Sequence, residues 1–98
     1  KHGLIGLTRA MAAEVAEQGV TVNCLCPGWT NTQLVDLEAM ASTRHTTVEV
    51  ERTRIASENL QKRILEPEEL GPMAALLAAD ESAGITGQVI SVDGGYKV

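Results

Sequence analysis

The first stretch of the sequence repeats apolar residues with the period of an α-helix. They recur at spacings of three and four residues, which places them on one helix face. The residues of this stripe are Leu4, Leu7, Thr8, Met11, Ala12 and Val15. Gly19, which adopts the left-handed conformation without penalty, marks the end of the run. We therefore expect a helix that buries this stripe and stops at Gln18 and Gly19.

The same helix lacks a start signal. Ser, Thr, Asp or Asn usually precedes a helix, but here the periodic run begins at once behind Lys1. A domain with a ragged start and a chain cut inside a larger domain both fit this pattern. We expect the second, so that the 98 residues form part of a longer domain.

A short strand and a loop follow this helix. Residues 20–26 alternate in character, are rich in β-branched side chains and end at Pro27 and Gly28, a pattern typical of a mostly buried strand. Residues 27–34 are rich in Pro, Gly, Asn and Thr, which favours a loop. The loop is therefore expected to begin where the strand ends.

Residues 33–63 are polar, charged and only weakly periodic. We expect one short helix near residues 34–40 and another over residues 48–60, with residues 41–47 as the break between them. A weakly amphipathic helix buries little apolar surface. We therefore interpret this segment as a mobile insertion rather than as core.

A further helix is expected over residues 66–82. Pro67 suits the first helical position, and the acidic residues after it suit the positive end of the helix dipole. Pro72 removes a backbone hydrogen bond and disfavours helix at Gly71, so we expect a kink or a loosened first turn there. The expected buried face consists of Leu70, Met73, Ala74 and Leu77.

A strand over residues 88–92 and a glycine turn complete the pattern. Asp93 is expected to accept hydrogen bonds from nearby backbone amides, with Gly94 and Gly95 permitting the tight turn. The order helix, strand, helix, strand implies parallel strands joined by a right-handed crossover. Because two parallel strands do not form a stable sheet alone, the fold class is α/β, as the C-terminal portion of a larger parallel sheet.

Composition and charge exclude several classes of protein. The net charge of −5 and the pI of about 4.9 argue against nucleic acid as the main partner. No apolar run reaches the roughly 18 residues that a membrane span needs. Cys24 and Cys26 share one strand face, poorly placed for a disulfide, and His2 and His45 are not spaced to complete a metal site. We interpret the cysteines as small buried residues in a reducing compartment, the cytoplasm.

Four segments resemble, in order and spacing, the C-terminal part of the short-chain dehydrogenase/reductase family. "KHGLIGLTRAMAAEVAEQGVTVN" resembles the helix and strand that follow the family's Tyr-x-x-x-Lys motif, with Lys1 as its lysine. "NCLCPGWTNT" resembles the Asn-x-x-x-Pro-Gly-x-x-x-Thr loop, and "PEELGPMAALLAADES" the Pro-Glu-Glu helix. "ITGQVISVDGG" resembles the terminal Thr-Gly-x-x-x-x-Val-Asp-Gly-Gly element. Together these segments span nearly the whole chain.

The resemblance implies a Rossmann-type doubly wound fold and a catalytic role for Lys1. In the family, a tyrosine four residues before the lysine exchanges a proton with the substrate oxygen. The lysine lowers the pKa of that tyrosine and hydrogen-bonds the nicotinamide ribose, so Lys1 is expected to be both catalytic and cofactor-binding. The family's Gly-rich loop, catalytic Ser and catalytic Tyr lie upstream of this lysine, and Tyr96 is the only tyrosine here.

The resemblance also implies cofactor contacts in the loop after the first strand. These carry over to Pro27, Gly28, Thr30 and Thr32, although Thr30 stands where the family usually has Val or Ile. A structural turn with locally bonded threonines is the alternative. Trp29, the only tryptophan, either lines the substrate pocket or packs as an ordinary aromatic residue.

The implied function is hydride transfer between NAD or NADP and a secondary alcohol or ketone. Hydroxybutyrate dehydrogenases and some ketoreductases of the family share Pro-Gly-Trp and Lys-His-Gly, which favours a small 3-hydroxy acid or 3-oxoacyl substrate. Residues 33–63 then form the substrate lid. Its basic side chains either contact an anionic substrate or form a solvated face: Arg44, Arg52, Arg54, Lys62 and Arg63.

The resemblance further implies a homotetramer, with the first helix and the last strand at subunit interfaces. Two other classes stay open: a non-catalytic relative that serves as a nucleotide sensor or scaffold, and a small interaction module. The residue four positions before Lys1 separates the enzyme from the first, because the reaction needs a tyrosine there. A soluble, cooperatively folding monomer of 98 residues would favour the second.

Overall fold

The computed structural model describes residues 2–97, which separate into two compact units. The first unit comprises residues 2–26 and 70–91. The second unit comprises residues 27–69 and 92–97. Each unit therefore contains two separate stretches of the sequence.

The first unit begins with helix α1, His2–Val15, which continues as a 3-10 turn, Ala16–Gln18. Gly19 follows in the left-handed conformation at φ 77°, and its N–H donates to the carbonyl oxygen of Ala16 at 3.1 Å. This is the ending that the sequence predicts, since glycine carries no Cβ that would clash in this conformation.

The burial of α1 differs from the prediction. Of its apolar stripe, only Thr8 and Ala12 are buried, and the Thr8 hydroxyl donates to the carbonyl oxygen of Leu4 at 2.8 Å. The larger members of the stripe expose 56%, 53% and 43% of their surface: Leu4, Leu7 and Met11. The helix therefore packs through its small residues and leaves its large apolar side chains open.

The helix predicted over residues 66–82 is divided. A 3-10 turn, Pro67–Glu69, comes before α4, Gly71–Ala78, and a second 3-10 turn, Asp80–Ser82, comes after it. Pro72 lies in the first turn of α4, where its missing N–H removes no intrahelical hydrogen bond. Instead of a kink or a loosened first turn at Pro72, the chain therefore has a break between the 3-10 turn and α4.

The predicted buried face of this helix is only partly covered. Among the residues of α4, none is buried. Three members of the expected face are half-buried and Ala74 is exposed; the half-buried members are Leu70, Met73 and Leu77.

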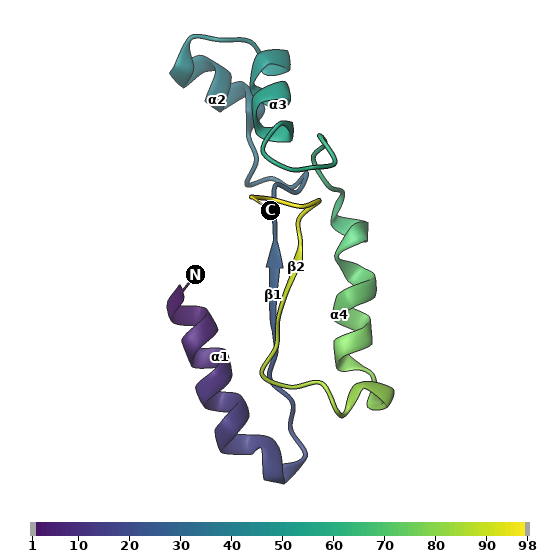
Figure 1. Ribbon diagram of the computed structural model, residues 1–98. Helices are drawn as coiled ribbons and strands as arrows, with labels where there is room; N and C mark the ends of the chain where they lie inside the picture. Colours follow the sequence, from purple (N-terminus) through teal and green to yellow (C-terminus); the bar gives the residue numbers. More distant parts are fainter. Residues whose placement is uncertain (1, 98) are drawn as a thin grey trace. The chain divides into compact units, whose positions relative to one another are not determined.

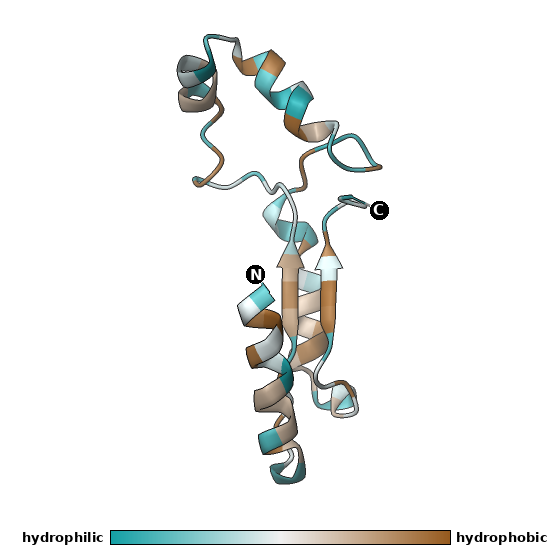
Figure 2. Ribbon diagram, turned by 60° about the vertical axis from the view of Figure 1, so that its left-hand side comes forward, coloured by the Kyte–Doolittle hydropathy of each residue, from teal (hydrophilic) through white to brown (hydrophobic). Residues whose placement is uncertain are grey.

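Strands β1, Cys24–Pro27, and β2, Val89–Val92, form a two-stranded sheet (Figure 1). The N–H of Cys24 donates to Gln88 at 2.8 Å and the N–H of Gly28 to Val92 at 3.3 Å, so both strands advance in the same direction. Helices α1 and α4 lie on opposite faces of this parallel pair (Figures 1 and 2). The α/β class is therefore confirmed.

Strand β1 is shorter than the expected strand over residues 20–26. The N–H of Val22 donates to the hydroxyl of Thr86 at 3.0 Å. The Asn23 side chain donates to the carbonyl of Ile85 at 2.9 Å and accepts from the N–H of Gln88 at 3.0 Å. The backbone N–H of Gly87 also donates to the carbonyl of Val22 at 2.8 Å, so backbone pairing and side-chain hydrogen bonds together join the two segments ahead of β1.

The second unit contains two short helices, α2, Leu37–Arg44, and α3, Val48–Ala56, packed against each other. Their number is as predicted, but α2 lies later than residues 34–40 and extends into the expected break over residues 41–47, because Asp36 caps it. Asp36 caps α2 and Thr47 caps α3. Each side chain accepts a hydrogen bond from the backbone N–H three residues on, at 3.0 and 3.2 Å respectively.

The prediction that residues 33–63 contribute no core is wrong. Ile55 and Glu51, both on α3, expose 0% of their surface, and the neighbouring Leu65 exposes 2%. The weak apolar periodicity of this segment leads to a wrong prediction because part of its buried interior is polar. The second unit thus has a core of its own.

Candidate functional site

The loop that follows β1 is fixed by a close contact at Gly28. A Cβ added to Gly28 would lie 2.7 Å from the Cβ of Asp93 and 3.0 Å from its Cα, closer than non-bonded carbon atoms approach. Only glycine therefore allows this loop to pack against the chain after β2. The loop begins at the carboxyl end of a parallel strand, where ligands of open α/β sheets usually bind.

A second contact holds the next residues of the loop. The N–H of Leu65 donates to the carbonyl of Trp29 at 3.0 Å, and the N–H of Asn31 donates to the carbonyl of Leu65 at 2.8 Å. These bonds form an isolated parallel bridge between Thr30 and Leu65. The backbone of Trp29 and Thr30 is therefore held between two segments of the second unit.

Thr30 is buried, with 7% of its surface exposed, and its hydroxyl donates to the carbonyl of Gly28 at 3.0 Å. Threonine has nearly the shape of valine, so it fills the space of the family's branched apolar residue. The local hydrogen bond satisfies the hydroxyl that this exchange buries. The departure from Val or Ile is thus compatible with the loop.

Two hydrogen-bond donors of the loop have no acceptor within the described part of the chain. Within the described part of the chain, no acceptor is bonded to the backbone N–H of Thr30. Thr32 is exposed, and its oxygen accepts from the N–H of Leu34 at 3.3 Å, so its own O–H is still free to donate. The two threonines lie close together in space, since the N–H of Thr32 donates to the carbonyl of Thr30 at 2.8 Å.

The turn after β2 confirms the structural role predicted for Asp93. Its Oδ1 accepts hydrogen bonds from the N–H groups of Gly95 and Tyr96, at 2.9 and 3.2 Å. Gly94 and Gly95 have φ values of 68° and 85°, which residues with a Cβ rarely adopt. Asp93 therefore shapes the turn on which Gly28 rests.

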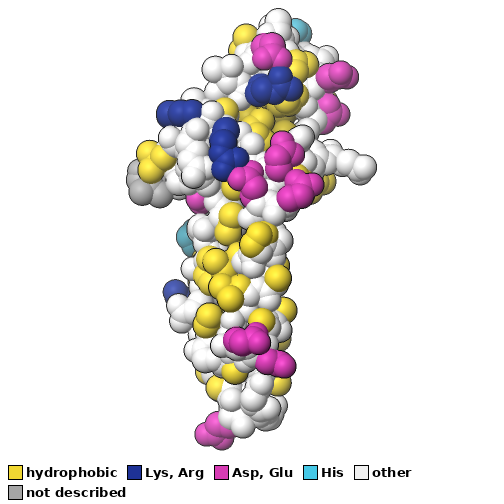
Figure 3. All heavy atoms as spheres, turned by 90° about the vertical axis from the view of Figure 1, so that its right-hand side faces the viewer, with side chains coloured by type: hydrophobic (Ala, Val, Ile, Leu, Met, Phe, Trp, Pro, Cys, Tyr) yellow, Lys and Arg dark blue, Asp and Glu magenta, His cyan; other side chains and the backbone are white. Residues whose placement is uncertain are grey.

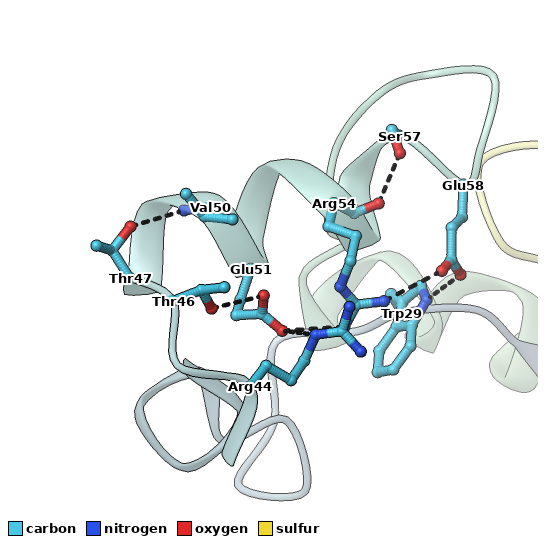
Figure 4. Close-up of polar contacts among 9 residues, drawn as sticks. All are labelled: Trp29, Arg44, Thr46, Thr47, Val50, Glu51, Arg54, Ser57 and Glu58. Atoms are coloured by element: carbon cyan, nitrogen blue, oxygen red, sulfur yellow. Dashed lines mark hydrogen bonds and ion pairs between the residues drawn. The ribbon is translucent and has the colours of Figure 1, made fainter. Parts of the chain in front are cut away.

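Trp29 is half-buried and makes a polar contact that the sequence did not predict. Its indole Nε1–H donates to Oε2 of Glu58 at 2.7 Å, across 29 positions of the chain (Figure 4). Glu58 comes shortly after the last residue of α3. No local sequence signal pairs these two residues, because their contact depends on the fold of the second unit.

The four arginines proposed as contacts for an anionic substrate all pair with glutamates. Their partners are Glu51 for Arg44, Glu49 for Arg52, Glu51 and Glu58 for Arg54, and Glu69 for Arg63. The ammonium group of Lys62 donates to the carbonyl of Ser57 at 2.9 Å. The basic charge of this unit is therefore largely compensated from within.

One of these pairs, Arg63 with Glu69, lies beside a hollow of about 330 Å³. Arg63 donates to both carboxylate oxygens of Glu69, at 2.7 and 2.6 Å. This contact, together with the hydrogen bond from the N–H of Glu66, lowers the pKa of Glu69 to about 2. The loop residues Trp29 and Thr32 do not line the hollow, whose lining is Asn31, Val35, Leu37, Arg52, Lys62, Arg63, Ile64 and Glu66.

Other candidate chemistry is limited within the described residues. Lys1, the expected catalytic lysine, lies outside them. The Sγ atoms of Cys24 and Cys26 are 3.7 Å apart, whereas a disulfide bond measures about 2.05 Å, so no disulfide joins them. Residues 2–97 contain no group of His, Cys, Asp and Glu arranged to hold a metal ion. They also contain no helix with the length and apolar character that crossing a bilayer requires.

Comparison with known proteins identifies relatives over nearly the whole chain. A family model described as enoyl-(acyl carrier protein) reductase matches residues 1–97. The D-beta-hydroxybutyrate dehydrogenase of Rhizobium meliloti is 41% identical over 99 residues, covering 98% of this chain and 38% of that protein. The chain thus spans little more than a third of the length of this relative.

Solved structures give the same result. A short chain dehydrogenase family protein from Francisella tularensis superimposes with a TM-score of 0.90 at 27% identity, covering 98% of this chain and 40% of the other. An actinorhodin polyketide ketoreductase solved with NADPH gives a TM-score of 0.84 at 33% identity, covering 95% and 36%. With a matching family model, related sequences and the same fold, the chain belongs to the short-chain dehydrogenase/reductase family.

Proposed function

We propose that the full protein transfers a hydride between NAD or NADP and a secondary alcohol or ketone. The observation that carries this proposal is the pair of donors at the end of β1, the N–H of Thr30 and the O–H of Thr32. Such donors match the single carbonyl oxygen of a nicotinamide carboxamide, which has two lone pairs and accepts two hydrogen bonds. Family membership and the NADPH in the related ketoreductase structure support the same cofactor class.

In this proposal the loop after β1 holds the nicotinamide end of the cofactor. Pro27 and Gly28 set the path of the backbone, Thr30 contributes its N–H and Thr32 its hydroxyl. The cofactor supplies or accepts the hydride when it is bound. Trp29 contacts the substrate, and residues 33–63 form the lid over it.

Lys1 has a role of its own in the reaction proposed for the full protein. We assign it the role of the family's motif lysine, which favours the phenolate form of a tyrosine four residues earlier and binds the nicotinamide ribose. The tyrosine then exchanges the proton with the substrate oxygen while the hydride moves. Lys1 is thus both a catalytic and a cofactor-binding residue in this proposal.

The substrate class we propose is a small 3-hydroxy acid or the corresponding 3-oxoacyl compound. The support is the likeness to a D-beta-hydroxybutyrate dehydrogenase and to a polyketide ketoreductase. We also propose a cytoplasmic homotetramer, for which the exposed Leu4, Leu7 and Met11 of α1 offer an apolar surface.

The test is a steady-state assay of the full-length protein with NAD and NADP, using 3-hydroxybutyrate and a simple secondary alcohol as substrates. We expect cofactor reduction with at least one pair. The variant Lys1→Ala should lower kcat/KM by about 10²-fold or more, whereas the control Lys97→Ala, which removes an exposed lysine, should not. Absence of cofactor reduction with every pair, or an unchanged kcat/KM in Lys1→Ala, would contradict the proposal.

A further inference from the structure

The indole of Trp29 is held by a charged partner. Its Nε1–H, the only polar group of the side chain, donates to Oε2 of Glu58 at 2.7 Å. A hydrogen bond to an ionised carboxylate is stronger and more directional than one between neutral groups. The contact therefore fixes the rotation of the ring as well as its position.

Glu58 is in turn linked to the interior of the second unit through Arg54. Nη1 of Arg54 lies 3.7 Å from Oε1 of Glu58, and Nη2 lies 3.2 Å from Oε1 of Glu51. Figure 4 shows the guanidinium between the two carboxylates, with the indole beside it. Arg54 thus connects the partner of Trp29 to a residue of the core.

Glu51 is the anchor of this connection. It exposes 0% of its surface, and its carboxylate accepts a hydrogen bond from the Thr46 hydroxyl at 2.9 Å and pairs with Arg44 at 3.2 Å as well as with Arg54. Burial raises the pKa of Glu51, but the hydrogen bonds from Thr46 and Arg54 and the charges of Arg54 and Arg44 outweigh it, and the pKa lies below its ordinary value. The anchor therefore stays ionised near neutral pH.

The network is better suited to fixing geometry than to adding stability. Among the described residues, the Nε of Arg54 is the only buried side-chain nitrogen or oxygen without a hydrogen-bond partner. An unsatisfied buried donor is unfavourable, and buried ion pairs in general contribute less to stability than apolar packing of equal volume. Through Glu58, the network reaches the indole of Trp29 at the candidate site.

We propose that Glu58 is a positioning residue for Trp29, held in place by Arg54 and Glu51, and that it orients the indole against the bound substrate. The proposal rests on the function proposed above, in which Trp29 contacts the substrate. The ring then presents a fixed apolar face to the short carbon chain of the substrate. Loss of Glu58 leaves the ring free to rotate and weakens substrate binding.

The test compares Glu58→Ala and Glu58→Gln with the control Glu49→Ala in the full-length protein. Glu49 also lies on α3 and pairs with an arginine, Arg52, but among the described residues neither member of that pair bonds to Trp29. The first readout is the indole N–H resonance of Trp29 in ¹⁵N-tryptophan-labelled protein, assigned by its loss in Trp29→Phe. The second readout is the KM for substrate and for cofactor, with kcat.

We expect Glu58→Ala to shift the indole resonance and to raise the substrate KM by about three- to tenfold, the size of a well-oriented aromatic contact. The cofactor KM should stay unchanged. Glu58→Gln keeps an acceptor oxygen, so its indole resonance and substrate KM should lie closer to those of the wild type. Glu49→Ala should alter neither the resonance nor the substrate KM. In a Trp29→Phe background, Glu58→Ala should have no further effect on substrate KM, because the two residues act through one contact.

Two results would overturn the proposal. One is an unchanged indole resonance in Glu58→Ala, which would mean that Glu58 does not hold the ring. The other is a shifted resonance with a substrate KM equal to that of Glu49→Ala, which would make the contact structural only. A full-length wild-type protein without any dehydrogenase activity would instead refute the proposed function and with it the substrate role of Trp29, while the resonance would still decide whether Glu58 holds the ring.

Discussion

In the first unit the buried side chains are small, whereas in the second unit they include large and charged ones. The buried residues of the first unit are Thr8, Ala12, Cys24, Cys26 and Ser82. Those of the second unit include Ile55, Leu65 and the carboxylate of Glu51. All ion pairs found among the described residues lie in the second unit as well.

The difference teaches that apolar periodicity marks a helix face that favours cover, whether or not these 98 residues themselves supply the cover. The strongly periodic α1 leaves its large apolar side chains exposed, and Figure 3 shows hydrophobic side chains gathered on the surface around α4. The weakly periodic α3 holds the most deeply buried side chains of the described residues. A pattern indicates which face of a helix favours cover, but only the surrounding structure provides that cover.

The largest effect on the free energy of unfolding should come from truncating a core side chain of the second unit. Ile55→Ala removes a side chain with 0% exposure and should lower the free energy of unfolding by about 2–5 kcal/mol. The control Leu34→Ala removes a side chain that is 95% exposed in the same unit and should change it by less than about 0.5 kcal/mol. Denaturant unfolding of both variants measures the difference. Equal losses would mean that the second unit has no independent core.

A smaller effect on the free energy of unfolding should come from placing a larger side chain at Ala12, where α1 packs against Gly87. Ala12 is 5% exposed and its Cβ lies 3.6 Å from the position of a Cβ on Gly87, so Ala12→Leu should cost about 1–3 kcal/mol through overpacking. The control Glu14→Ala, at an exposed position of the same helix outside its apolar stripe, should cost less. Thermal unfolding of the two variants provides the test. A loss in Ala12→Leu no larger than in Glu14→Ala would contradict the tight packing at Ala12.

The smallest effect concerns the charged surface of the second unit. The pKa of Glu69 is lowered from 4.5 to about 2 by its contact with Arg63, so the unfolded chain binds more protons between these values. The pair therefore stabilises the fold above pH 4.5, and its contribution disappears as the pH falls toward 2. Glu69→Gln should flatten the decline of stability over this range, whereas Glu68→Gln, at an exposed position, should not. Unfolding curves at a series of pH values test this, and an unchanged slope in Glu69→Gln would contradict it.

Much of the local structure could be predicted from the sequence because it depends on neighbouring residues. The stop at Gly19, the two helices of residues 33–63 and the Asp93 turn each follow from a residue type and its immediate surroundings. Burial could not be predicted in the same way. Leu7 is exposed and Glu51 is buried, because each depends on what lies opposite in space.

In the candidate site, too, the residues could be selected from the sequence, but their contacts across the fold could not. The resemblance to a family selects Pro27, Gly28, Thr30 and Thr32, but their spacing alone does not. The packing of Gly28 against Asp93 follows from the pairing of the two strands. The contact between Trp29 and Glu58 joins segments that no sequence period relates, so it becomes visible only in the folded second unit.

The most direct test of the central claim, that the loop after β1 holds the nicotinamide, is an NMR titration of the ¹⁵N-labelled full-length protein with NADH and NADPH. The amide signals of Thr30 and Thr32 should shift saturably with one of the two cofactors. The amide of Gly87, in the first unit and bonded to Val22 at 2.8 Å, should serve as the unaffected reference. Saturable cofactor binding that leaves the amide of Thr30 unmoved would contradict the claim.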